Sequence, residues 1–121
     1  MKLTLDATQY ANVDILPTMS LKEAADLLGQ MFGGLQFERD QGYYEEYPAY
    51  VADDEQADAL LSLLGIPDPK YEIRTNPSPN YLLMVEPMKH VDATFEHDIS
   101  EQIAAMINAD GRLKAHVPSK A

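Results

Sequence analysis

Two histidines and three carboxylates in the last third of the chain are the side chains best suited to binding a metal ion or transferring protons. The set is His90, Asp92, Glu96, His97 and Asp98. Its spacing contains neither the paired histidines of a helical zinc site nor the alternating acids of a calcium loop. No nucleophile motif accompanies it, so general acid–base hydrolysis gains no support. We therefore expect a polar loop that leads into a helix, with no metal, cofactor or catalytic residue.

Three glycines form a second group of interest, because glycine-rich loops can bind phosphate. Gly33 and Gly34 follow a predicted helix and Gly29 lies near its end, so none of the three precedes a helix, and no Gly-Lys-Ser/Thr sequence occurs. Glycines in this position are typical of a helix end. The chain also contains no cysteine, which removes disulfides, thiolate metal sites and cysteine nucleophiles from consideration.

The most unusual segment is QGYYEEYPAYVADDEQAD, residues 41–58, which holds four of the seven tyrosines among many carboxylates. Successive side chains of a strand alternate between faces, so one face cannot bury all four tyrosines. Tyrosine beside carboxylates suits a protein interface, because the ring supplies rigid apolar area and the charge attracts a cationic partner. The alternative is a half-buried strand with a solvated rim. The predicted partner-binding residues are Tyr43, Tyr44, Glu45, Glu46, Tyr47, Asp53, Asp54, Glu55 and Asp58, whereas Tyr50 is expected in the core.

The net charge of −11 narrows the class of partner. Twenty acidic residues stand against nine basic ones, and residues 38–58 alone hold eight acids and one base. Such a surface repels nucleic acid and anionic membranes, so neither is expected as a direct partner. The apolar runs are too short to cross a bilayer, and the N-terminus lacks the apolar stretch of a signal peptide. A cytoplasmic location is therefore expected.

Two helices are predicted. Ser20 and Glu23 form a capping box ahead of apolar residues at helical spacing, which predicts a helix over 21–32 that ends at the glycine pair 33–34. Asp98 or Ser100 is expected to cap a second helix, which ends at 110–111. Its inward face is predicted to carry Ile99, Ile103, Met106 and Ile107.

A short strand or an extended arm is predicted at 1–5, and strands are predicted at 35–40, 43–53, 71–75, 81–86 and 112–117. Pro48 cannot donate to a ladder, which favours an edge or a bulge there. Residues 54–64, DEQADALLSLL, are consistent with a helix or a buried strand, and the absence of β-branched residues favours the helix. The apolar run at 82–85 is typical of a central strand. We predict one α+β domain, residues 1–121, with a mainly antiparallel sheet of about four or five strands and at least two packed helices.

The order of these segments resembles that of small bacterial immunity proteins of contact-dependent inhibition and related polymorphic toxin systems. The resemblance spans residues 33–113 and is carried by GGLQFERD, EYPAYVAD, LLGIPDP before YEIRT, NPSPN and DISEQIAAMINADGRL. It implies a non-catalytic cytosolic protein that binds and neutralises a cognate toxin domain, often a nuclease. Such families vary most where they touch the toxin, so the resemblance assigns no contact residue.

Three functional hypotheses follow from these observations. The leading one is an immunity protein whose acidic, tyrosine-rich surface binds a basic toxin domain, with a nuclease as the favoured class. The second is a small acidic adaptor or chaperone-like module without a toxin partner. The third, with least support, is a metal-dependent enzyme that uses His90 and His97. The oligomeric state is left open.

Overall fold

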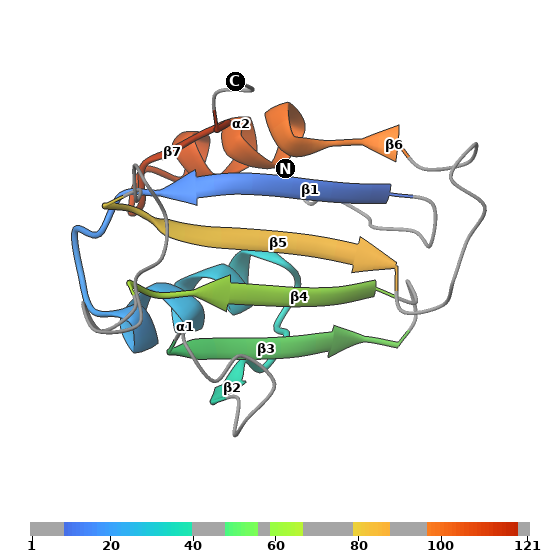
Figure 1. Ribbon diagram of the computed structural model, residues 1–121, viewed down its shortest axis with the longest axis horizontal. Helices are drawn as coiled ribbons and strands as arrows, with labels where there is room; N and C mark the ends of the chain where they lie inside the picture. The colour runs from blue at the N-terminus through green and yellow to red at the C-terminus, as the bar shows by residue number, and fades with distance from the viewer. Residues whose placement is uncertain (1–8, 40–47, 56–58, 67–78, 88–96, 119–121) are drawn as a thin grey trace.

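The computed structural model describes residues 9–39, 48–55, 59–66, 79–87 and 97–118. These residues form two helices and a mostly antiparallel sheet, which confirms the predicted α+β class. Seven strands are present among them, more than the four or five expected. Both helices lie on one side of the sheet, behind it in the view of Figure 1.

The helices begin and end close to their predicted boundaries. Helix α1 (Leu21–Met31) begins with the predicted capping box: Ser20 Oγ accepts from the Glu23 N–H at 3.2 Å, and Glu23 Oε1 accepts from the Ser20 N–H at 3.3 Å. Gly33 and Gly34 follow it with φ of 84° and 91°, values that favour glycine.

Helix α2 (Ser100–Asp110) ends at Gly111, as predicted, and Gly111 has a left-handed backbone conformation. Its start differs from the prediction, because the N-cap residue is Ile99, which has no side chain able to accept a hydrogen bond. Asp98 acts from one residue earlier, where its Oδ1 accepts from the Ser100 N–H at 2.9 Å. Of the predicted inward face, Ile99, Ile103 and Ile107 are buried, and Met106 packs half-buried against them.

The sheet runs in the order β2-β3-β4-β5-β1-β6, with β7 also paired to β1. Only the β1–β6 pair is parallel among the described strands. Their bounds are β1 (Gln9–Ile15), β2 (Glu38–Arg39), β3 (Ala49–Asp54), β4 (Ala59–Leu64), β5 (Tyr81–Pro87), β6 (His97–Asp98) and β7 (Ala115–His116).

The helix favoured for residues 54–64 was wrong. Residues 59–64 form β4, which pairs with β3 on one side and β5 on the other. Leu61 and Leu63 are fully buried on the helix side, and Ser62 and Leu64 are buried on the opposite side. Leucines occupy both faces of β4, so the strand shows no alternation of polar and apolar residues and its pattern resembles that of a helix.

Two strands were not predicted. β1 alternates buried Ala11, Val13 and Ile15 with the more exposed Asn12 and Asp14, the ordinary pattern of a half-buried strand. β6 comprises His97 and Asp98, which were expected in a polar loop.

Other predicted strands are confirmed over part of their length. β5 lies centrally, as expected from its apolar run, between β4 and β1. The pairing of 35–40 with 43–53 is present as β2 with β3, although β2 has two residues. Pro48 directly precedes β3, and its carbonyl accepts from the Gly65 N–H at 2.7 Å. β7 is the short counterpart of the strand expected at 112–117. The strands predicted at 1–5 and 71–75 lie outside the described residues.

The hydrophobic core lies between the helices and one face of the sheet. Alternate residues of the central strands point into it, among them Val13, Leu61, Leu63, Leu83 and Val85. They pack against both helices in one continuous cluster, with Leu28 from α1 and Ile103 and Ile107 from α2. The remaining strand residues therefore project from the sheet face that carries neither helix.

Candidate protein-binding surface

The predicted tyrosine and acid segment is described only in part. Tyr43, Tyr44, Glu45, Glu46, Tyr47 and Asp58 lie outside the described residues. Asp53, Asp54 and Glu55 lie at the end of β3. Asp53 pairs with Leu60, and Asp54 pairs with Ala59, so these adjacent carboxylates project from opposite faces of the sheet. The structure therefore does not bring Asp53 and Asp54 together on one surface.

Tyr50 occupies the position expected of a core tyrosine. It pairs with Leu63, which places it on the helix side of the sheet. Its ring is half-buried and packs against the hydrophobic core. Since Val51 and Asp53 alternate with Tyr50 along the strand, they belong to the other face.

That other face, the open face, carries strand side chains that lie outside the core cluster. The strand registers place Val51, Ser62 and Met84 side by side in one row, and Asp53, Leu60 and Glu86 in the next. Val51, Leu60, Leu82 and Met84 are half-buried. Apolar side chains thus remain partly accessible in the middle of a sheet, where docking against another protein would cover them.

The charges on the open face are acidic. Asp53 is exposed, Glu86 is half-buried, and they flank Leu60 from the two neighbouring strands. Within the described part of the chain, neither carboxylate has an ion-pair partner. Asp14 also projects from this face, and its Oδ2 lies 3.1 Å from His116 Nε2. Asp53 and Glu86 therefore present charges that no described cation neutralises, beside accessible apolar groups.

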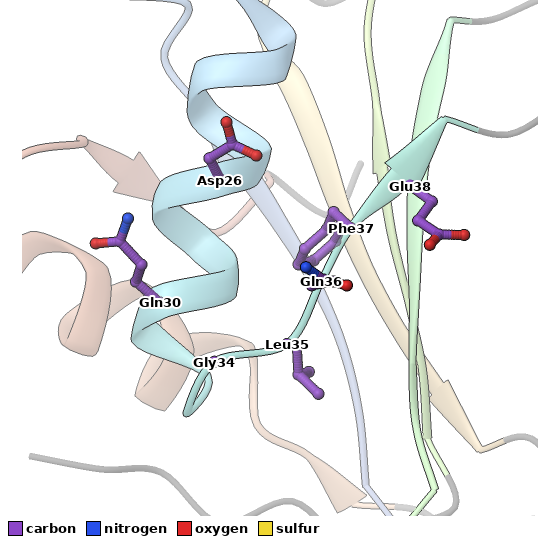
Figure 2. Close-up of a pocket in the computed structure, with 7 residues that line it drawn as sticks. All are labelled: Asp26, Gln30, Gly34, Leu35, Gln36, Phe37 and Glu38. Carbon is purple, nitrogen blue, oxygen red and sulfur yellow. The ribbon is translucent and has the colours of Figure 1, made fainter.

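A shallow groove of about 490 Å³ lies on the helix side of the molecule, between α1 and the chain leading into β2 (Figure 2). Two of its polar side chains already have partners. Asp26 Oδ2 is 3.1 Å from Lys22 Nζ, and Gln30 Oε1 accepts from Arg112 Nη1 at 3.1 Å. No serine, cysteine, histidine or lysine occurs among the lining residues. They are Asp26, Gln30, Gly34, Leu35, Gln36, Phe37 and Glu38.

Only part of the histidine and carboxylate set identified in the sequence lies within the described residues. His90, Asp92 and Glu96 lie outside the described residues, whereas His97 and Asp98 form β6. Asp98 Oδ1 accepts hydrogen bonds from both the N–H and the hydroxyl of Ser100, at 2.9 and 2.5 Å. Asp98 therefore has a structural role at the start of α2. Over the ranges described, no three His, Cys, Asp or Glu side chains are grouped so as to hold a metal ion.

Neither of the two described helices is long and apolar enough to cross a membrane. No protein-family model, curated protein or solved structure matches the chain.

Leu60 and Glu86 were missed as candidate surface residues. Leu60 belongs to residues 54–64, for which a helix was favoured. Glu86 is the last acid of an otherwise apolar strand and is separated from Asp53 by more than thirty positions. Only the register of β3, β4 and β5 brings these residues into one row. Residues 59–64, ALLSLL, show no alternation of polar and apolar residues, so the sequence carries no signal that places Leu60 on this face.

Proposed function

We propose that this protein is a cytoplasmic immunity protein that binds and neutralises a cognate toxin domain. The observation that carries the proposal is the open face, where half-buried Leu60 and Met84 lie beside the carboxylates of Asp53 and Glu86. Accessible apolar area at the centre and charge around it are features of protein-binding surfaces. The order of sequence segments, which resembles that of immunity proteins, agrees with this assignment.

The charge of the chain favours a basic partner. Twenty acids against nine bases create a negative field that attracts a cationic surface before contact. A nuclease is the favoured class of toxin, because a protein that grips phosphates needs a basic cleft. An acidic protein can occupy that cleft in place of nucleic acid. Electrostatic steering can raise association to about 10⁸ M⁻¹s⁻¹ at low salt, which suits an inhibitor that must act early.

Neutralisation by occupancy requires binding without turnover. The proposal therefore assigns no catalytic residue and no cofactor to the chain, and it gives its surface acids a recognition role. An adaptor with a different partner would use the same face, but its gene would have no fixed toxin neighbour.

The test is protection in cells. The domain encoded by the reading frame directly upstream is expressed alone and together with this protein, and growth is measured. We expect the domain alone to arrest growth and co-expression to restore it. A lysine substitution of Glu101, an exposed residue of α2, serves as a control that should still protect. An upstream domain that is harmless, or toxicity that co-expression leaves unchanged, would refute the proposed function.

A further inference from the structure

The row Asp53–Leu60–Glu86 indicates how charged and apolar groups are arranged on the partner, which net charge alone does not. β3, β4 and β5 are adjacent strands, so the two carboxylates stand on either side of Leu60. Neighbouring strands lie about 5 Å apart, which separates the backbones of Asp53 and Glu86 by about 10 Å. Leu60 is half-buried between them, and Met84 lies in the adjoining row.

We propose that this row receives a basic protein surface in which an apolar side chain lies between two lysine or arginine side chains. The inference rests on the proposed function and locates the toxin contact on the open face, to which the tyrosine-rich segment contributes Asp53. The apolar group of the partner packs on Leu60, and the cations pair with Asp53 and Glu86. Burial of either carboxylate without such a cation would cost free energy, so an apolar or acidic partner is disfavoured.

Charge complementarity also decides against a second copy of this chain as the occupant. Two open faces brought together would place Asp53 and Glu86 of one copy near the same carboxylates of the other. The net charge of −11 adds repulsion over longer distances. A cationic partner removes both penalties.

The test is binding kinetics with the purified domain encoded directly upstream. Asp53→Lys and Glu86→Lys should each slow association about tenfold at low salt, because reversed charges act on the encounter. Glu101→Lys, which changes the net charge equally but lies on α2, should stay within about twofold of wild type. Leu60→Ala should raise the dissociation rate about tenfold, as truncation of a central contact does. Circular dichroism verifies that each variant is folded.

The double variant Asp53→Asn, Glu86→Gln removes both charges and keeps the shapes of the side chains. It tests the proposed contact even if Leu60→Ala does not fold. We expect about a tenfold loss of affinity for it. The docking site lies elsewhere if wild type binds but the affinity of the double variant and the association rates of both lysine variants stay within about twofold of wild type. That result would refute only this inference and not the proposed function. A dimer of the free protein in light scattering, disrupted by Leu60→Ala or by Asp53→Lys, would also overturn it. A wild-type chain that does not bind the domain refutes the proposed function and this inference together.

Discussion

The hydroxyl oxygen of Ser100 accepts a hydrogen bond from the backbone N–H of Asn12 at 2.9 Å. This contact joins the first residue of α2 to the middle of β1, between the points where β6 and β7 pair with the same strand. The neighbouring Ile99 N–H donates to the Tyr10 carbonyl at 2.9 Å. Ser100 therefore extends the pairing of β1 past the end of β6, and it fixes α2 against the sheet.

Replacing Ser100 by alanine should lower the free energy of unfolding by about 1–3 kcal/mol, because the Asn12 N–H loses its acceptor in a partly buried position. The measurement is urea denaturation followed by circular dichroism. Asn12→Ala is the matched control, since it keeps the backbone donor and removes an exposed side chain, and it should change stability by less than about 0.5 kcal/mol. Equal stabilities for Ser100→Ala and wild type would show that the hydroxyl does not anchor the helix.

Gly29 should not tolerate a side chain. A Cβ at this position would lie 2.1 Å from the carbonyl oxygen of Leu35, in the chain that turns back along α1. Gly29→Ala should therefore destabilise the protein by about 1–3 kcal/mol, the usual cost of overpacking, although alanine is the better helix former. Thermal unfolding measures the effect. Gln102→Ala, at an exposed position of α2, is the control and should have almost no effect. An unchanged or higher melting temperature for Gly29→Ala would contradict the close approach of Leu35.

The Arg112 guanidinium hydrogen-bonds to Asp110 and lowers the pKa of that carboxyl below its ordinary value. A lowered pKa in the folded state stabilises the protein above the unfolded pKa of about 4. That contribution is lost as the pH falls through the folded pKa. NMR titration of the Asp110 carboxyl should give a pKa below the ordinary value of an aspartate, and Arg112→Ala should raise it. The pair is exposed, so its effect on stability should be small. A titration that Arg112→Ala leaves unchanged would contradict the assigned cause.

The tyrosines and acids of residues 41–58 allow a separate kinetic prediction. If this segment also contacts the toxin, Tyr43→Ala, Tyr44→Ala or Tyr47→Ala should speed dissociation, with a cost of about 2 kcal/mol at a hot spot. Reversal of Glu45, Glu46 or Glu55 to lysine should instead slow association and weaken its salt dependence. Surface plasmon resonance separates the two rates.

Tyr50 is the control within this segment, because it packs against the core. Tyr50→Ala should lower stability before it changes binding. If the association and dissociation rates of every surface variant stay within about twofold of wild type, residues 41–58 are only the solvated rim of a strand and do not contact the toxin.

The helices and the central strand could be predicted from sequence because their signals are local. The Ser20–Glu23 capping box marks the start of α1, and Gly111 marks the end of α2. Each signal lies within a few residues of the helix end that it marks. β4 could not be recognised with the same ease, since a strand with leucines on both faces shows no periodicity that separates it from a helix. In β1, the alternation at 11–15 was present and was overlooked in favour of residues 1–5.

The candidate surface was harder to predict because it depends on register. Asp53 was identified through its acidic neighbours, but Asp54 beside it projects from the opposite face. Leu60 and Glu86 join Asp53 only through the pairings of β4 with β3 and β5. A single sequence does not show which residues of distant strands stand opposite each other. The partner-binding surface was therefore predicted in the segment where acidic residues are most frequent along the chain.

Titration calorimetry between this protein and the purified domain encoded directly upstream tests the central claim most directly, when it is repeated over a series of salt concentrations. We predict a stoichiometric complex whose affinity falls steadily as salt rises, because opposite charges on the two surfaces are screened. The absence of binding, or an affinity that salt leaves unchanged, would contradict the proposal that the acidic face of this protein recognises a basic toxin.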